Sequence, residues 1–113
     1  CDRKRDMVIS GGVNIYPAEI EAVLITCPGV KDCAVFGIPD AEYGEQLMAV
    51  VEAQPGIPPP SIDEVRTYLG QHLAGYKVPK HIEFGAGLPR EDSGKIFKRR
   101  LRDPYWAKAG RAI

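Results

Sequence analysis

Apolar residues recur at helical spacing directly after Pro17. They fall on one face of an α-helix, at Ile20, Val23, Leu24 and Cys27. Proline suits the first turn of a helix, because its missing N–H would have no partner there. Pro28 and Gly29 then break the pattern. The sequence therefore predicts an amphipathic helix that begins at Pro17 and ends before Pro28.

Two continuous apolar runs follow, at residues 33–38 and 47–53. Both are too short for helices and both are flanked by turn residues, so we predict strands over about 30–39 and 47–53. Shorter β-prone runs at residues 7–9 and 81–84 predict two more strands. Residues 10–14, Ser-Gly-Gly-Val-Asn, are expected to form a tight turn or loop.

A second helix is indicated by Ser61 and Glu64, which have the spacing of a capping box. It continues through Val65, Leu69 and Leu73, after a stiff proline-rich connector at residues 54–60. A loop over 85–94 and a basic helix from Lys95 to about Tyr105 complete the chain. This order of elements predicts a small α+β domain in which a small sheet is flanked by helices.

Charge does not point to a polyanionic partner. The 113 residues suit a single domain. Lys plus Arg and Asp plus Glu number 15 each, so no overall basic field favours nucleic acid or an anionic membrane. The balance is uneven along the chain, since residues 95–102 are basic while 17–21 and 40–45 are acidic.

Cysteine and histidine give no sign of a metal site. Cys1, Cys27 and Cys33 are odd in number and form no C-x-x-C pair, and His72 and His81 do not complete a zinc ligand set. We therefore expect a reducing, cytoplasmic location and no metal bound by this domain. No apolar run is long enough to span a membrane, and the charged first residues do not suit a signal peptide. The chain starts without Met, so we expect it to be part of a longer protein.

Two segments combine glycine with charge, at residues 2–21 and 88–99. The second contains Gly94-Lys95, but it is not a phosphate-binding P-loop, because Pro89 occupies the position of the required glycine and Ile96 that of the required Ser or Thr. A lysine on such a loop can enter another domain's active site and stabilise charge on phosphate or carboxylate oxygens. From the residues alone, the simpler interpretation, a solvated lysine at the head of a basic helix, is favoured over such a catalytic role.

Together the two segments resemble the signature stretches of the C-terminal domain of adenylate-forming enzymes, in the acyl-CoA synthetase branch. The first reads Asp-Arg-x-x-Asp and then Gly-Gly-x-Asn-Ile-Tyr-Pro-x-Glu-Ile-Glu; the second reads Leu-Pro-Arg-x-x-Ser-Gly-Lys-Ile-x-Lys-Arg. Between them, residues 28–30, 37–40, 44–45 and 76–80 are similar to intermediate landmarks of the family. The resemblance covers nearly the whole chain up to Arg102.

This resemblance implies a lid domain that serves two half-reactions. A larger N-terminal domain would bind the carboxylic acid and ATP with Mg²⁺, and Lys95 would enter its site while acyl-AMP and pyrophosphate form. The lid would then rotate so that its other side lines the channel for CoA, through Ser10, Gly11, Gly12, Val13, Asn14, Ile15 and Tyr16. Arg5 matches the hinge position, where Lys or Asp is common in the family, and Asp2 and Arg3 match linker residues near the nucleotide.

The implied division of the chain is a hinge or linker at 1–6, the lid at 7–103 and a tail at 104–113. Its partners would be its own N-terminal domain, the acid, ATP and CoA, with no nucleic acid. Lys95 also resembles family lysines that are silenced by acetylation, which would remove the cation. The acid itself and the oligomeric state stay open, and the fragment alone is expected to be inactive.

Two other interpretations remain open. One keeps the chemistry but delivers the acyl group to the thiol of a carrier protein. The other is a non-enzymatic binding module whose basic helix meets an acidic partner.

Overall fold

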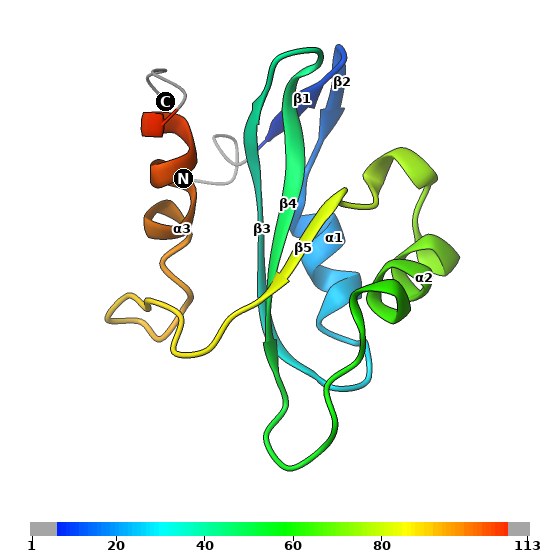
Figure 1. Ribbon diagram of the computed structural model, residues 1–113, viewed down its shortest axis with the longest axis vertical. Coiled ribbons are helices and arrows are strands. Elements are labelled where there is room, and N and C mark those ends of the chain that lie inside the picture. Colours follow the sequence, from blue (N-terminus) through cyan, green and yellow to red (C-terminus); the bar gives the residue numbers. More distant parts are fainter. Residues whose placement is uncertain (1–6, 109–113) are drawn as a thin grey trace.

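The computed structural model describes residues 7–108. Its elements are β1 (Val8–Ser10), β2 (Val13–Ile15), α1 (Pro17–Leu24), β3 (Val30–Asp40), β4 (Gly44–Ala53), α2 (Ile62–His72), a short 3₁₀ helix η2 (Gly75–Lys77), β5 (His81–Phe84) and α3 (Lys98–Lys108). The predicted α+β fold with helices flanking a sheet is confirmed. Figure 1 shows α1 and α2 on one side of the sheet β3-β4-β5 and α3 on the other. A separate two-stranded sheet, β1-β2, was not predicted.

Strands β3 and β4 form one long antiparallel hairpin that is the scaffold of the domain. Their register runs from Val30 opposite Ala53 to Asp40 opposite Gly44. The connecting turn is held by Asp40, whose Oδ1 accepts the backbone N–H groups of Glu42 and Tyr43 at 2.7 and 2.9 Å. These hydrogen bonds lower the pKa of the Asp40 carboxyl. Strand β5 pairs in parallel with β4, which requires a crossover, and α2 lies in that crossover.

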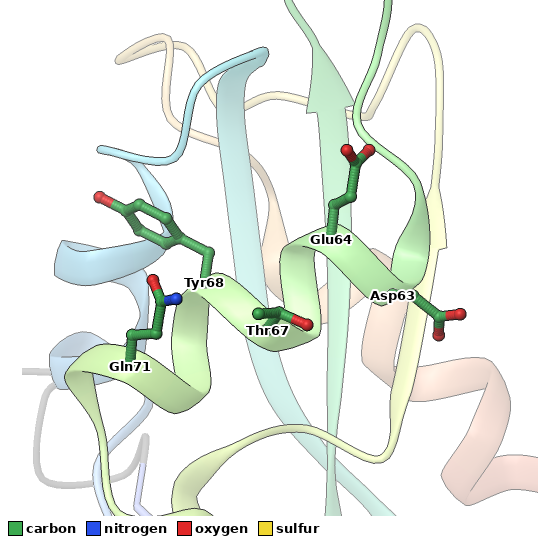
Figure 2. Close-up of a pocket in the computed structure, with 5 residues that line it drawn as sticks. All are labelled: Asp63, Glu64, Thr67, Tyr68 and Gln71. Carbon is green, nitrogen blue, oxygen red and sulfur yellow. The ribbon is translucent and has the colours of Figure 1, made fainter.

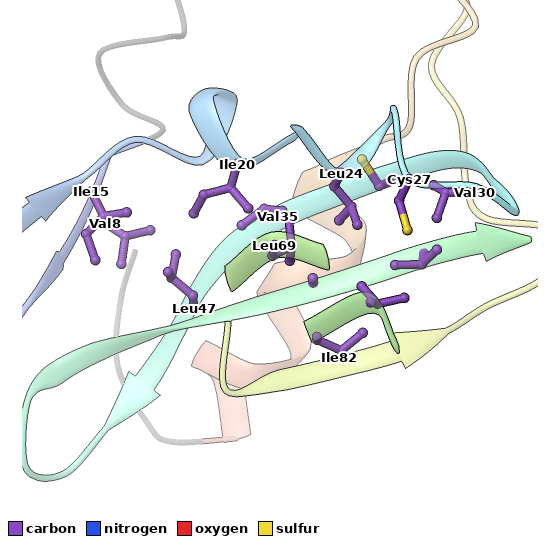
Figure 3. Packing of buried hydrophobic residues seen from close by; sticks show 14 residues of the cluster. Val8, Ile15, Ile20, Leu24, Cys27, Val30, Val35, Leu47, Leu69 and Ile82 are labelled. Carbon is purple, nitrogen blue, oxygen red and sulfur yellow. The ribbon is translucent and has the colours of Figure 1, made fainter. Parts of the chain in front are cut away.

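Hydrophobic residues pack on both faces of this hairpin, which explains why its strands read as continuous apolar runs. The larger core lies under α1, α2 and the β1-β2 sheet and contains Val8, Ile15, Ile20, Leu24, Cys27, Val30, Cys33, Val35, Leu47, Ala49, Val51, Val65, Leu69 and Ile82 (Figure 3). The smaller core lies under α3, where Leu88, Leu101 and Tyr105 cover Phe36, Ile38, Met48 and Val50.

The helix at residue 17 ends earlier than predicted. It stops at Leu24, and single turns follow in which Thr26 and Cys27 donate to the carbonyls of Val23 and Leu24. Cys27 is still buried. The predicted capping box of α2 is confirmed, because the Ser61 hydroxyl accepts the Glu64 N–H and the Glu64 carboxylate accepts the Ser61 N–H.

The last helix begins later and ends later than predicted. It starts at Lys98, not Lys95, because residues 90–96 fold as a loop, and it continues through Pro104 to Lys108. Trp106 anchors this final stretch: its side chain is buried and its Nε1–H donates to the Gly37 carbonyl at 2.9 Å. The boundary expected between residues 103 and 104 thus falls inside a helix.

Strand β3 lies at one edge of its sheet, and side chains from α1 and α3 reach it there. The Glu21 carboxylate accepts the Val35 N–H at 2.8 Å and pairs with the Lys98 ammonium at 2.9 Å. Glu21 therefore binds the strand edge and does not serve as a first-turn carboxylate of α1; Glu19 stands in the first turn and pairs with Lys77 at 2.9 Å. Within residues 7–108, no helix has the length and apolar character needed to cross a membrane.

Candidate functional site

Lys95 stands on a short, internally bonded loop, here called the lysine loop (residues 90–96). Arg90 and Ile96 close it as an antiparallel bridge. Inside it, the Glu91 N–H donates to the Lys95 carbonyl at 2.8 Å and the Gly94 N–H to the Glu91 carbonyl at 2.9 Å. Gly94 has φ of +92°, a conformation that glycine adopts without the steric cost of a side chain. The Lys95 side chain is exposed, so the loop presents an ammonium group to whatever docks beside it.

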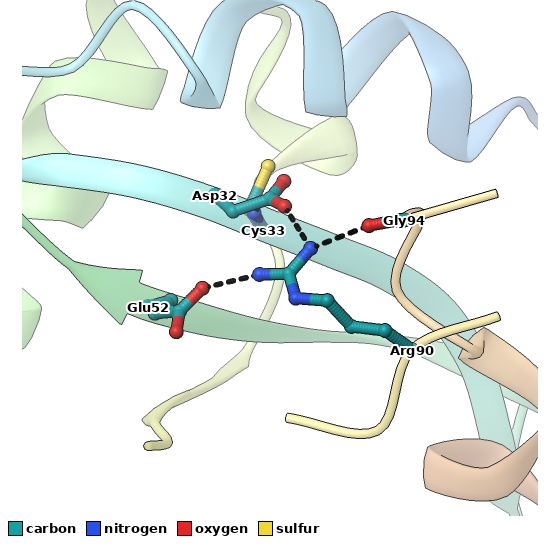
Figure 4. A network of polar contacts seen from close by, with 5 residues as sticks. All are labelled: Asp32, Cys33, Glu52, Arg90 and Gly94. Atoms are coloured by element: carbon teal, nitrogen blue, oxygen red, sulfur yellow. Dashed lines mark hydrogen bonds and ion pairs between the residues drawn. The ribbon is translucent and has the colours of Figure 1, made fainter. Parts of the chain in front are cut away.

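The lysine loop is fastened to the sheet by Arg90 (Figure 4). One guanidinium nitrogen donates to Asp32 Oδ2 at 2.8 Å and to the Gly94 carbonyl at 3.0 Å, and the other donates to Glu52 Oε1 at 2.5 Å. The hydrogen bond to Asp32, with the charges of both carboxylates, raises the pKa of Arg90. The guanidinium therefore stays charged and joins β3, β4 and the residue before Lys95.

The second candidate segment is the hairpin turn, defined as Ser10 to Val13 at the tip of β1 and β2. Residues 10–14 were expected to be turn or loop throughout; in fact Val13–Ile15 is a strand paired with Val8–Ser10. Gly11 and Gly12 have φ of 59° and 85°, as the two central residues of a type I′ turn require. The Gly11 N–H donates to the Tyr43 carbonyl at 3.0 Å, which ties this turn to the β3-β4 turn.

The seven residues predicted to line a CoA channel do not share one environment. Ile15 is 2% exposed and lies beside Val8 in the larger core, so its side chain faces away from solvent. Ser10 is half-buried, while Gly11, Gly12, Val13, Asn14 and Tyr16 are exposed. The surface available to a ligand is therefore the glycine turn together with the side chains of Val13, Asn14 and Tyr16. Asp2, Arg3 and Arg5 lie outside the described residues.

The structure does not bring the two segments together. The hairpin turn grows out of the larger core, on the α1 and α2 side, whereas the lysine loop leads into α3 on the other side of the sheet (Figure 1). The hairpin turn and the lysine loop therefore lie on separate surfaces of the domain.

A shallow surface depression lies elsewhere. It follows the outer side of α2 and is lined by Asp63, Glu64, Thr67, Tyr68 and Gln71 (Figure 2). None of the described residues predicted for the site lines it. Over residues 7–108, no three His, Cys, Asp or Glu side chains gather in a way that would hold a metal ion.

Sequence reasoning missed the partners of Arg90. Arg90 belongs to the quoted motif, but Asp32 and Glu52 are 58 and 38 residues away from it along the chain. Only the register of β3 and β4 places these two acids side by side. For the strands of the hairpin turn, the acidic stretch at residues 40–45 was a partial indication in the sequence, because Glu45 Oε1 accepts the Ile9 N–H at 2.7 Å.

Comparisons with known proteins agree with this fold. The chain is 47% identical, over 94% of its length, to a long-chain-fatty-acid–CoA ligase, FadD13, of Mycobacterium tuberculosis, and it is 44% identical, over 99% of its length, to a fatty acid–[acyl-carrier-protein] ligase, ScoC, of Streptomyces coeruleorubidus. It spans 21% of each relative's own length. A solved structure of a Mycobacterium tuberculosis fatty acyl CoA synthetase superposes with a TM-score of 0.82 at 46% identity, covering 92% of this chain and 20% of that one.

The family model described as the AMP-binding enzyme C-terminal domain matches residues 19–95, from the first turn of α1 to the lysine itself. The resemblance drawn from the two glycine-bearing segments is thereby confirmed. The chain belongs to the family of AMP-binding enzyme C-terminal domains.

Proposed function

We propose that this chain is the C-terminal lid of an ATP-dependent acyl-CoA synthetase acting on fatty or related acids. The observation that carries the proposal is the arrangement of one sheet with an exposed lysine on one side and a glycine turn on the other. Such a domain can serve two half-reactions in turn by docking in two orientations. Its relatives, which bear ligase names, support this assignment.

In the first half-reaction a carboxylate oxygen attacks the α-phosphorus of ATP, and pyrophosphate leaves. The N-terminal domain would bind the acid and ATP with Mg²⁺, and the Lys95 ammonium would stabilise negative charge as it develops on carboxylate and α-phosphate oxygens. A fixed cation acts most strongly where the closed lid excludes water. Lys95 suits this role because its side chain is exposed while its loop is held in place.

In the second half-reaction the CoA thiol sulfur attacks the acyl carbonyl of acyl-AMP and AMP leaves. The lid would rotate about Arg5, with Asp2 and Arg3 near the nucleotide, and present the hairpin turn to the pantetheine arm. Gly11 and Gly12 have no side chains, so the backbone can approach a thin ligand closely. Alternating one lid between two steps also protects the reactive adenylate from water. A cytoplasmic location is part of the same proposal.

One alternative acceptor has a specific observation in its favour. The relative ScoC is named as a ligase that uses an acyl-carrier protein, and it is 44% identical to this chain. A carrier protein presents the same pantetheine thiol as CoA, so the hairpin turn suits either acceptor.

The full-length enzyme, assayed for pyrophosphate and AMP release with a panel of carboxylic acids, tests the proposal. We expect CoA-dependent thioester formation, and we expect Lys95→Ala to slow adenylate formation by roughly a hundredfold or more, as loss of a transition-state donor does elsewhere. If the acyl group of the adenylate is transferred only to a carrier protein, the acceptor is that protein and not CoA. Normal adenylate formation by Lys95→Ala would refute the role of this lysine.

The isolated 113 residues should not turn over ATP, because the pockets for ATP and acid would lie in the other domain. Pyrophosphate release by the purified chain would contradict the lid assignment.

A further inference from the structure

Two carboxylates face each other at the base of the β3-β4 hairpin. Asp32 and Glu52 are direct cross-strand partners. Like charges in that position repel, and both side chains are partly buried, at 34% and 17% exposure. The pair therefore forms a strong site for one planar cation that can bind both acids together.

Arg90 fills that site with a geometry that lysine cannot reproduce. Its two terminal nitrogens reach the two carboxylates separately, at 2.8 Å to Asp32 and 2.5 Å to Glu52. The nitrogen that binds Asp32 also donates to the Gly94 carbonyl at 3.0 Å. A lysine ammonium is a point charge on a flexible stem and lacks this fixed fork.

The contact to Gly94 connects the acid pair to the candidate catalytic group. Gly94 precedes Lys95 directly, and its carbonyl is held at the level of the sheet by Arg90. The backbone on the other side of Lys95 is held as well, because Ile96 bridges Arg90 and the Phe97 N–H donates to the Pro89 carbonyl at 2.7 Å. The start point of the Lys95 side chain is thus fixed relative to β3 and β4.

We propose that Arg90 is a positioning residue for the adenylate-forming step, and that the Asp32–Arg90–Glu52 cluster sets the place from which Lys95 reaches the substrate oxygens. The inference rests on the proposed function and adds to it which residues place the lysine. It has a selective consequence. The cluster matters while Lys95 is in the active site and not in the orientation in which the hairpin turn faces the acceptor thiol.

The test measures the two half-reactions separately in the full-length enzyme. Adenylation is followed as pyrophosphate release with acid and ATP; thioester formation is followed with supplied acyl-AMP and CoA. We expect Arg90→Gln to slow adenylation roughly ten- to a hundredfold, the scale of a misplacement of about 1 Å, and to leave the thioester step unchanged. Arg90→Lys should fall between this variant and the wild type, and Asp32→Asn combined with Glu52→Gln should reproduce the selective loss.

Arg66→Gln is the matched control. Arg66 also donates to a backbone carbonyl, that of Lys80 at 2.7 Å, and lies near Asp63 at 3.7 Å, but it stands on α2, on the other side of the sheet from α3. Removing it should change neither half-reaction. Thermal melting of each variant verifies that equal amounts of folded enzyme are compared.

The outcomes separate this inference from the proposed function. If Arg90→Gln slows both half-reactions equally, or if its loss follows the loss of folded protein, Arg90 is only structural and the inference is wrong. A second outcome is that Lys95→Ala abolishes adenylation while Arg90→Lys and the Asp32/Glu52 double variant, which keeps Arg90, are both normal. In that case the inference fails and the proposed function stands. If Lys95→Ala itself is normal, the proposed function fails first.

Discussion

The hairpin turn and the lysine loop both place glycine at a surface tip, yet they are held by different forces. The strands below the hairpin turn bury Val8 and Ile15 in the larger core. The lysine loop is held instead by backbone hydrogen bonds and by the ion pairs of Arg90. Partly exposed ion pairs are screened by salt, whereas apolar burial involves no charges that salt could screen. Within one small domain, the hairpin turn is thus anchored mainly by packing and the lysine loop mainly by charge and hydrogen bonds.

The hairpin turn can be destabilised through the buried residues of its strands. Ile15→Ala should lower the free energy of unfolding of this chain by about 2–5 kcal/mol, because it removes a side chain that is 2% exposed and leaves a cavity. Val13→Ala, two residues away and 43% exposed, should cost less than about 0.5 kcal/mol. Urea denaturation measures both. Equal losses from the two variants would mean that the hairpin is not anchored by its buried face.

The larger core contains a thiol, that of Cys33, which should lower the stability of the fold at alkaline pH. Burial, with help from the Glu21 charge, raises the pKa of the Cys33 thiol from 9.0 to about 12. Above pH 9 the unfolded chain loses a proton that the folded chain keeps, so the stabilising contribution is complete below pH 9 and declines as the pH rises toward 12.

One such proton corresponds to a slope of about 1.4 kcal/mol per pH unit. The free energy of unfolding, measured in urea from pH 8 to 11, should stay level up to about pH 9 and then decline toward this slope, and Cys33→Ala should reduce the decline. The remaining slope would include Cys27, whose pKa burial also raises. An unchanged slope in Cys33→Ala would contradict the assignment.

The hairpin turn itself should tolerate little change. Gly12→Ala forces a side chain into φ of 85° and should cost about 1–2 kcal/mol. Gly11→Ala adds a Cβ that lies 3.2 Å from Tyr43 Cδ1 and should cost slightly more.

Gly56→Ala is the matched control for this pair, because Gly56 has the same φ of 85° and open space around it but lies in the distant connector. All three variants should lose stability in urea. Only those at Gly11 and Gly12 should also slow the thioester half-reaction of the full-length enzyme, and an equal effect from Gly56→Ala would remove the hairpin turn from that step.

How far the sequence predicts this molecule depends on the range of the interactions. The capping box at Ser61 and the strand at 81–84 are set by residues close together in the chain, and both were predicted correctly. The strand predicted at 7–9 corresponds to β1, but β2 was taken for a loop, because it is three residues long and only Ile15 in it is buried. The start of α3 was placed too early, because Lys95 and Ile96 close the lysine loop by pairing with Glu91 and Arg90 instead of starting a helix. Lys95 was identified from its motif. The acids that hold its loop could not be identified, because only the register of β3 and β4 brings them together.

The edge of β3 has a consequence for how the domain behaves in a crowded solution. A free strand edge presents unpaired N–H and C=O groups that invite a strand from another molecule. Here the Val35 N–H already binds Glu21 and the Gly37 carbonyl already binds Trp106. Another copy of the chain would have to displace a carboxylate and a buried indole before its own strand could pair. Two side chains on separate helices thus keep the longest strand of the domain from seeding self-association.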